Sequence, residues 1–184
     1  DGLGDAVISA WDGTMYLGVL LIDFSTASID ISSPSFSQVL WITNSFQSEP
    51  MTFAPAGDFN GDSYNDFAVG NLKGTLVNSA AVMLGTDPAG YQSFFFDLEN
   101  MNLGNTPAVI MITGDPSYGV VGTSVGFAGD VNADGFDDIL VGVPGYDSNN
   151  GAVFIVTGSS PSTDVDLTGI PGNSQGLIIT HSTQ

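Results

Sequence analysis

Two stretches of the chain decide its fold: residues 58–70 are DFNGDSYNDFAVG, and residues 130–142 are DVNADGFDDILVG. In both stretches the first, third, fifth and ninth positions are Asp or Asn, and an apolar run that ends in Gly follows. The two stretches begin 72 residues apart, at positions 58 and 130. Self-similarity at a fixed interval is typical of repeat proteins, so we expect one structural unit to recur along the chain.

Other landmarks recur in the same order. Residues 1–9 form a shortened third copy that matches the second half of the acidic stretch. An apolar–Asp–apolar sequence, here called an Asp triplet, occurs as Ile29-Asp30-Ile31, Phe96-Asp97-Leu98 and Val165-Asp166-Leu167. An apolar run that ends in Thr, here called a Thr run, occurs at 40–43, 110–113 and 177–180. We therefore divide a single domain, residues 1–184, into repeats at approximately 1–43 (partial), 44–113 and 114–180.

Each repeat is predicted to contain four short strands. In the best-preserved copy they lie near 109–113, 120–128, 138–143 and 152–157, with Gly, Pro, Asn and Asp turns between them. Four-stranded antiparallel sheets at a constant interval are typical of β-propeller blades, whereas a repeated sandwich or a solenoid fits less well. The chain holds about two and two-thirds repeats, and propellers close with roughly 4 to 8 blades. The prediction is an all-β propeller segment that further blades or copies complete.

The charge balance restricts the possible partners. Among 184 residues there are 20 Asp and Glu but a single basic side chain, Lys73, which gives a formal net charge of -19. Nucleic acid is excluded as a partner, because phosphate binding needs several Lys or Arg. No apolar run reaches about 18 residues, so no membrane insertion is predicted. The absence of Cys excludes disulfides and thiol chemistry.

The acidic stretches offer a set of oxygen ligands. Side-chain oxygens at positions 1, 3, 5 and 9 of a short turn, with a main-chain carbonyl at position 7, can converge on one cation. Ca²⁺ accepts about 6 to 8 oxygens in flexible geometry, whereas Mg²⁺ demands a strict octahedron, so Ca²⁺ fits better. We predict two complete loops and a partial one: Asp58, Asn60, Asp62, the Tyr64 carbonyl and Asp66; Asp130, Asn132, Asp134, the Phe136 carbonyl and Asp138; and Asp1, the Leu3 carbonyl and Asp5.

The residues of these loops allow two interpretations other than calcium binding. An EF-hand requires Glu at position 12, where this chain has Val69 and Val141, so that interpretation fails. A metal-free turn stays open, because Asp and Asn side chains readily bond neighbouring backbone N–H groups. Against it, the carboxylates of each loop have no cation nearby and would repel one another.

The sequence does not indicate catalysis. The single histidine, His181, has no Gly-x-Ser-x-Gly elbow with which to build a hydrolase site. Asp30, Asp97 and Asp166 recur at the repeat interval, which places them on different blades. A repeated structural turn or cap explains them better than a pair of glycosidase carboxylates. The aromatic run at 94–96 is expected to fill a sheet interface.

The run from Gly122 to Gly158 closely resembles the FG-GAP repeat of integrin α-subunit β-propellers and their bacterial or other extracellular relatives. Val121-Gly122 stands at the family's Phe-Gly, and Gly142-Val143-Pro144 stands at its Gly-Ala-Pro. The resemblance extends through 51–86 and, in register, through 1–24. The second copy departs from the pattern at Asn71-Leu72-Lys73, in place of Gly-Ala-Pro, and at Ser63, where Gly is usual.

The resemblance implies a calcium-stabilised propeller, usually seven-bladed and extracellular, with its calcium loops on one face and its partners often on the other. From it we expect a non-catalytic module at the cell surface or outside the cell that binds a protein or glycan ligand in adhesion. Two alternatives stay open: an accessory propeller of a secreted hydrolase, and a structural subunit of a surface filament or layer.

Overall fold

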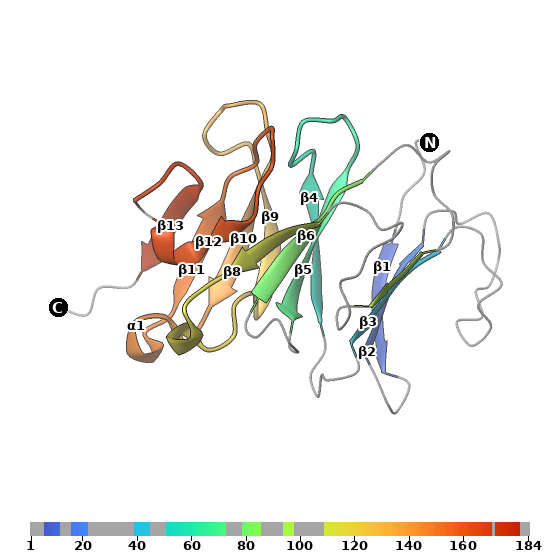
Figure 1. Cartoon of the computed structure of the whole chain (residues 1–184), viewed down its shortest axis with the longest axis horizontal. Coiled ribbons are helices and arrows are strands. Elements are labelled where there is room, and N and C mark those ends of the chain that lie inside the picture. The colour runs from blue at the N-terminus through green and yellow to red at the C-terminus, as the bar shows by residue number, and fades with distance from the viewer. Residues whose placement is uncertain are drawn as a thin grey trace.

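In the computed structural model the described residues are 6–11, 16–21, 39–44, 51–72, 79–85, 94–97, 109–170 and 172–180. Their strands form three sheets (Figure 1). The N-terminal sheet has the order β1-β2-β3-β7: β1 (Ala6–Trp11), β2 (Tyr16–Leu21), β3 (Val39–Asn44) and β7 (Phe94–Asp97). The other two sheets, which lie side by side, carry the complete acidic stretches.

The middle sheet has the order β12-β8-β6-β5-β4: β4 (Thr52–Gly57), β5 (Asp66–Leu72), β6 (Ser79–Met83), β8 (Val109–Thr113) and β12 (Val165–Asp166). The C-terminal sheet has the order β13-β11-β10-β9: β9 (Ser124–Gly129), β10 (Asp138–Val143), β11 (Ala152–Val156) and β13 (Gly176–Thr180). Three short helical elements lie in the connections between strands: η2 (Pro116–Tyr118), α1 (Tyr146–Asn149) and η3 (Leu167–Gly169).

The strands do not all belong to the sheets that the sequence suggested. Strands exist at 109–113, 138–143 and 152–156, and the predicted strand at 120–128 is shorter, beginning at Ser124. The strand at 109–113 nevertheless completes the preceding sheet, and the Thr run at 177–180 supplies the outer strand in its place. β8 follows β6 in the chain after β7, β13 follows β11 after β12, and each pairs antiparallel with that earlier strand of its own sheet.

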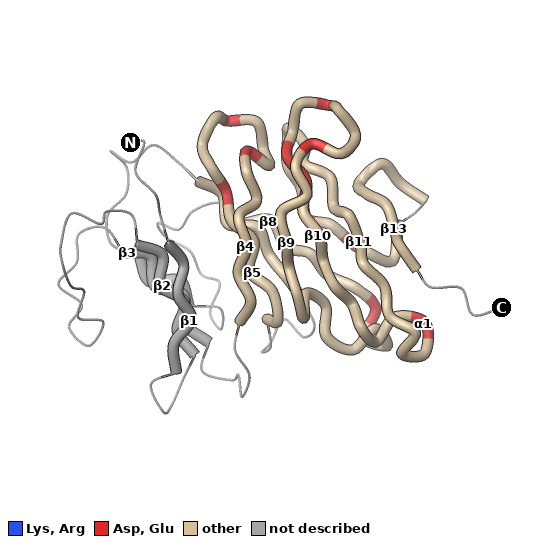
Figure 2. The backbone as a smooth tube through the Cα atoms, turned by 180° about the vertical axis from the view of Figure 1, so that it is seen from behind, with Lys and Arg blue, Asp and Glu red and all other residues tan. Residues whose placement is uncertain are grey.

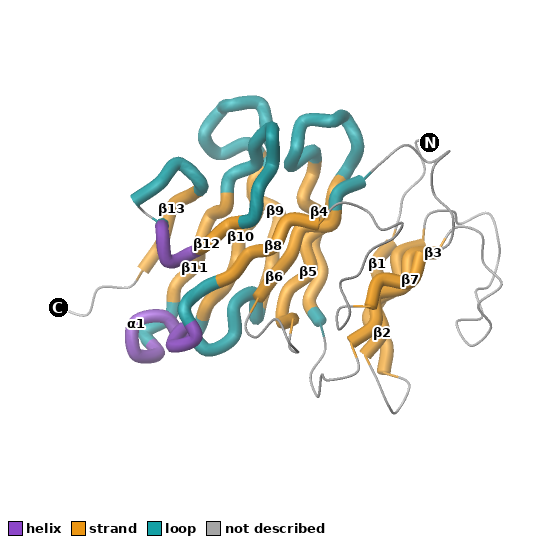
Figure 3. The backbone as a smooth tube through the Cα atoms, in the orientation of Figure 1, coloured by secondary structure: helices purple, strands orange, loops and turns teal. Residues whose placement is uncertain are grey.

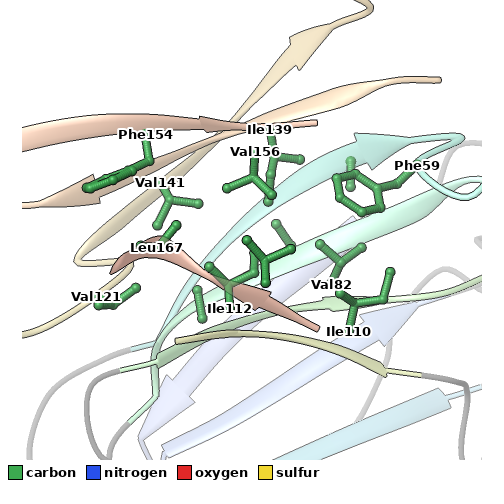
Figure 4. Packing of buried hydrophobic residues seen from close by; sticks show 14 of the residues in the cluster. Phe59, Val82, Ile110, Ile112, Val121, Ile139, Val141, Phe154, Val156 and Leu167 are labelled. Carbon is green, nitrogen blue, oxygen red and sulfur yellow. The ribbon is translucent and has the colours of Figure 1, made fainter. Parts of the chain in front are cut away.

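The hydrophobic core lies between the middle and C-terminal sheets (Figure 4). Alternate residues of a strand face the same side, so β8 places Ile110 and Ile112 in this interface. The facing sheet contributes Val141 and Phe154, which are fully buried. Removing these side chains from water stabilises the packing by roughly 1.5 to 3 kcal/mol each, so the two sheets hold each other together.

The Val121-Gly122 pair joins the two sheets at a close approach of backbones. Val121 is fully buried in the core. Gly122 has φ +74°, and a Cβ there would lie 2.8 Å from the Ala80 Cβ, so no other residue fits without movement. The Gly122 N–H donates to the Gly142 carbonyl at 3.0 Å, and its own carbonyl accepts from Thr52 Oγ1 at 3.1 Å.

Across the described residues the architecture is all-β with almost no helix, which confirms the predicted fold class and is consistent with a β-propeller segment. The two packed sheets resemble adjacent blades, with β4 and β9 as the neighbouring inner strands. Within the described residues, no helix combines the length and the apolar character needed to cross a membrane.

Candidate functional site

The two acidic loops lie at the same end of the paired sheets. One joins β4 to β5 and the other joins β9 to β10 (Figure 3). Figure 2 shows the acidic residues of both loops along the backbone at that end, with further acidic residues near α1 at the opposite end. The loops also bond to each other: the Asp58 N–H donates to Asp137 Oδ2 at 2.9 Å, and the Asp137 N–H donates to the Asp58 carbonyl at 3.2 Å.

Asp66, the last predicted ligand of the first loop, ties three segments together. Its side chain is only 3% exposed. Its Oδ2 accepts from the Phe59 N–H at 2.8 Å, and its Oδ1 accepts from the Gly85 N–H at 2.7 Å. The carboxylate therefore closes the loop and also anchors the segment that follows β6.

Asp138 repeats this arrangement in the second loop. It is fully buried; its Oδ2 accepts from the Val131 N–H at 2.8 Å and its Oδ1 from the Gly158 N–H at 3.0 Å. Because the same two bonds occur in both loops, we call Asp66 and Asp138 the clamp aspartates. Each has both oxygens held by backbone donors, so each loop keeps its shape through a buried carboxylate.

Burial is the main electrostatic influence on the clamp aspartates. It raises the pKa of Asp66 from 3.8 to about 6, against the lowering effect of the Gly85 and Phe59 N–H bonds. The negative charges of Asp62 and Asp58 raise it further. Burial likewise raises the pKa of Asp138, with smaller contributions from Asp134 and Asp130. Both effects raise a carboxyl pKa, because burial and neighbouring negative charges each disfavour the ionised form.

The exposed part of each loop is folded by side-chain bonds to its own backbone. In the first loop, Asn60 Oδ1 accepts from the Asp62 N–H at 3.0 Å, and Asp62 Oδ1 accepts from the Tyr64 N–H at 2.9 Å. In the second loop, Asn132 Oδ1 and Asp134 Oδ1 accept from the Asp134 and Phe136 N–H groups, both at 3.0 Å. Side-chain bonds of this type are expected for a metal-free turn rich in Asp and Asn.

The first ligand position distinguishes the two loops. Asp130 accepts with both oxygens, from the Asp134 N–H and the Gly135 N–H, each at 3.0 Å. Asp58 accepts with Oδ2 only, from the Ser63 N–H at 2.9 Å, and its Oδ1 is buried without a hydrogen-bond partner. A buried carboxylate oxygen without a donor is costly, and a cation at that atom would satisfy it.

The structure brings the predicted side chains into their loops without gathering them around one point. In the described part of the chain, no group of three or more His, Cys, Asp or Glu is arranged to hold a metal ion. The reason is that most of the carboxylate oxygens are turned toward backbone N–H groups. The donor set, hard oxygens with one orphaned atom, still fits Ca²⁺. The predicted partial site at Asp1, Leu3 and Asp5 lies outside the described residues.

Both loops require left-handed backbone at the same two positions. The fourth positions, Gly61 and Ala133, have φ of +75° and +59°, and the sixth, Ser63 and Gly135, have φ of +73° and +93°. Non-glycine residues adopt this conformation at a cost. The departure noted at Ser63 therefore leaves the loop path unchanged and adds local strain.

Sequence reasoning missed Asp137, which joins the second loop to the first. The signal was present, because the eighth position is Asn65 in the first loop and Asp137 in the second. Because only the second loop has a carboxylate at this position, the Asp side chain is expected to make a contact that the first loop lacks. The structure shows that use: Asp137 Oδ2 accepts the Asp58 N–H, across the boundary between the two sheets.

Part of the chain is similar in sequence to known proteins. A family model described as FG-GAP repeat matches residues 121–156. Integrin alpha-5 of Xenopus laevis is 40% identical over 68 residues, which cover 36% of this chain and 6% of the relative. Integrin alpha pat-2 of Caenorhabditis elegans is 43% identical over 51 residues, which cover 27% of this chain and 4% of the relative. The matched regions are thus a small part of each relative. Residues 121–156 match the FG-GAP repeat, and these likenesses support an FG-GAP, integrin-like family for the chain.

Proposed function

We propose that the chain is a calcium-binding, non-catalytic β-propeller module that serves extracellular adhesion or ligand binding. The observation that carries the calcium assignment is the Asp58 Oδ1 atom, which is buried in an acidic loop and has no hydrogen-bond partner. An ion at this atom would satisfy it and would offset the repulsion between the neighbouring carboxylates.

The ligands of the first site would be Asp58, Asn60, Asp62, the Tyr64 carbonyl and Asp66. The second site would use the equivalent set: Asp130, Asn132, Asp134, the Phe136 carbonyl and Asp138. To bind, the exposed side chains give up their bonds to backbone N–H groups and turn inward. The clamp aspartates stay in place, because a carboxylate oxygen can accept an N–H bond and still present a lone pair to a cation.

The ion's role would be to fix the hairpins and not to carry out a reaction. The loops join the two inner strand pairs, β4 to β5 and β9 to β10. An ion that makes these loops rigid would also fix the ends of the strands that they connect. Loops built from exposed oxygens bind Ca²⁺ only weakly when the exposed ligands must first reorganise, and such sites fill where the ion reaches millimolar levels, as it does outside cells.

The ligand surface would lie at the other end of the paired sheets. There, η2 and α1 border a cavity of about 680 Å³, lined in part by Tyr118, Tyr146, Asp147 and Asn150. The Tyr118 and Tyr146 rings lie 5.0 Å apart. Asp147 lines the same cavity, its backbone is strained at φ +46°, and its Oδ2 accepts from Asn150 Nδ2 at 3.1 Å. Aromatic faces with a few polar groups suit a protein or glycan ligand.

Thermal unfolding in millimolar Ca²⁺ and in excess chelator tests the calcium assignment. Ca²⁺ at 100 times its Kd should stabilise the chain by about 2.7 kcal/mol per site, a shift of several degrees in Tm. The Asp62→Ala, Asp134→Ala double variant should lose this response. The matched control is Asp115→Ala with Asp147→Ala. Asp115 caps η2, where its Oδ1 accepts from the Ser117 N–H at 2.7 Å, and the pair removes the same charge away from the acidic loops, so this variant should keep the response. An unchanged Tm for the wild-type chain would refute the assignment.

A further inference from the structure

The two acidic loops differ at the residue that follows their third-position Asn. Gly61 follows Asn60 in the first loop, and Ala133 follows Asn132 in the second. An Asn-Gly pair favours spontaneous deamidation, because the glycine has no Cβ to hinder attack of its nitrogen on the side-chain amide. Among residues 1–184 the pair occurs at 60–61 and at 150–151. The chain therefore offers two candidate modification sites, which lie in different local structures.

Gly61 is required by the packing of one loop on the other. Its φ is +75°, and a Cβ at this position would lie 2.5 Å from Cε1 of the Phe136 ring in the second loop. A larger residue would have to displace that ring from a close-packed contact. The contact between the loops thus keeps a glycine directly after Asn60, and the reactive pair is a consequence of this packing.

Hydrogen bonds hold the Asn60 amide in a reactive arrangement. Its Oδ1 accepts from the Asp62 N–H at 3.0 Å, and its Nδ2 donates to Asp62 Oδ2 at 2.9 Å. Attack on the amide carbon places negative charge on Oδ1, and a donor already directed at that oxygen stabilises the charge. Gly61 is exposed, and its N–H has no hydrogen-bond acceptor within the part of the chain that the structure describes. The attacking nitrogen is therefore open to solvent.

The other Asn-Gly pair is arranged differently. The Gly151 N–H donates to the Tyr146 carbonyl at 3.0 Å, so the nitrogen that would attack is engaged. Asn150 Nδ2 donates to Asp147 Oδ2 at 3.1 Å, and among the described residues no donor is directed at Asn150 Oδ1. Both differences should make Asn150 less reactive than Asn60 in the folded chain.

The second loop isolates the effect of the glycine. Asn132 Oδ1 accepts from the Asp134 N–H at 3.0 Å, and Asn132 Nδ2 donates to Asp134 Oδ2 at 2.8 Å. These are the bonds that Asn60 makes in the first loop. The following residue is Ala133, whose Cβ hinders attack by its nitrogen. The two loops are thus a matched pair that differs at the residue on which ring closure depends.

We propose that Asn60 is a site of intramolecular deamidation. The Gly61 nitrogen gives its proton to hydroxide and bonds to Asn60 Cγ; the Cγ–Nδ2 bond breaks, and Nδ2 takes one proton from water and leaves as ammonia. Water then opens the five-membered imide at either carbonyl, which gives an aspartyl or an isoaspartyl residue. In sum, an amide and one water become a carboxylic acid and ammonia, without oxidation or reduction.

The modification would change the first loop and leave the second as it is. It adds a negative charge near Asp58, whose Oδ1 has no hydrogen-bond partner, and so increases the repulsion among the carboxylates. A further consequence rests on the proposed function. The added carboxylate of the aspartyl form should strengthen Ca²⁺ binding, whereas the isoaspartyl form lengthens the backbone between ligand positions and should weaken it.

Incubation of the folded chain in heavy-oxygen water at mildly alkaline pH tests the proposal. Chelator is present, so the result does not depend on bound Ca²⁺. Peptides are produced with pepsin in acid, where further deamidation is slow, and mass spectrometry measures the labelled acid formed at each Asn. We expect Asn60 to convert at least about tenfold faster than Asn132 and Asn150, which corresponds to a barrier lower by about 1.4 kcal/mol.

Two controls separate the fold from the sequence. In concentrated urea Asn60 and Asn150 should convert at similar rates, because both precede glycine and neither is held by the fold. In the folded chain, Ala133→Gly should raise the rate at Asn132 toward that of Asn60. The proposal is wrong if folded Asn60 reacts no faster than Asn132 or Asn150, or if Ala133→Gly leaves the rate at Asn132 unchanged.

The calcium assignment can fail without this proposal failing. Conversion at Asn60 in a chain whose Tm does not respond to Ca²⁺ supports the modification and refutes only the ion. If the ion does bind, Asn60→Asp should lower the Kd for Ca²⁺ in calorimetric titration, because it supplies the added carboxylate without the isoaspartyl form. An unchanged Kd would contradict the predicted effect of the modification on the first site.

Discussion

The two acidic loops share one framework and differ in how completely it satisfies their carboxylates. Both have a clamp aspartate with two backbone donors and left-handed residues at the fourth and sixth positions. The second loop also holds both oxygens of Asp130, whereas the first leaves Asp58 Oδ1 buried and unpartnered. The clamp aspartate and the left-handed positions therefore belong to both repeats, whereas the carboxylate oxygen without a hydrogen-bond partner occurs only in the first loop.

The acidic motif therefore has two separable roles: folding the loop and supplying oxygen ligands to an ion. Clamp aspartates preserve the loop path without any ligand, so their contribution belongs to folding. The first-position aspartates contribute to folding in the second loop and are available for an ion in the first. Variants at the two kinds of position should therefore differ in their response to Ca²⁺.

The largest expected effect comes from removing a clamp aspartate. Asp138→Ala leaves the Val131 and Gly158 N–H groups without their buried acceptor, and each such group costs about 1 to 3 kcal/mol. We expect a loss of about 3 kcal/mol in the free energy of unfolding, measured by urea denaturation in chelator. Asp66→Ala should lose a similar amount. A loss no larger than that of the exposed control Asp147→Ala would contradict the clamp role.

The first-position aspartates should differ from each other. In chelator, Asp130→Ala loses two backbone bonds and should destabilise the chain by about 1 to 2 kcal/mol. Asp58→Ala loses one bond but also removes the unsatisfied oxygen, so its cost should be below about 0.5 kcal/mol. In Ca²⁺ both variants should lose a further amount of stability, because each removes the first-position ligand of its proposed site. Equal losses in chelator would count against this distinction.

Acidity should reveal the burial of Asp66. The pKa of Asp66 is about 6 in the folded chain and has an ordinary value of 3.8, so the folded chain holds this proton more tightly. Without Ca²⁺, the resulting stabilisation is fully present below pH 3.8 and is lost as the pH rises through about 6. Wild-type stability should fall relative to Asp66→Asn across this interval, as measured by urea denaturation at several pH values. A constant difference between the two proteins would show that the shift is absent.

The smallest effect concerns the left-handed positions. Ser63→Gly and Ala133→Gly should each raise stability by about 0.5 kcal/mol, because relief of the left-handed strain slightly exceeds the added entropy of the unfolded chain. Gly135→Ala is the reverse experiment: its Cβ would meet nothing within 4 Å, so any loss reports backbone conformation alone. Differential scanning calorimetry resolves changes of this size. A gain from Gly135→Ala would contradict the strain argument.

Much of the fold could be predicted because its signals are local and repeated. Turn residues between short apolar runs located the strands, and the recurrence of the Asp triplets and Thr runs divided the chain into repeats. The sheet to which a strand belongs could not be predicted. β12 pairs with β8 across 53 residues, at Asp166 and Thr113, and no turn or spacing signal marks a parallel pair of that separation.

The sequence predicts which residues form the two loops, but it does not predict the hydrogen-bond partners of their oxygens. The spacing of Asp and Asn identifies the oxygens that line each loop, because a repeat places equivalent positions alike. Backbone N–H groups and a cation compete for the same oxygens, so the pattern of residue types is identical in the two cases. The orphaned Asp58 Oδ1 and the bridging Asp137 arise from the packing of one repeat on the next, which is absent from either repeat alone.

The paired bonds between Asp58 and Asp137 make the two loops energetically dependent on each other. Whatever immobilises the second loop also positions Asp137, and through it the backbone of Asp58. The first loop then loses less conformational entropy when it is ordered in turn. Two ligands that each order one loop would consequently bind with positive cooperativity, without any change in the arrangement of the sheets. By thermodynamic reciprocity, ordering the first loop would tighten the second by the same factor.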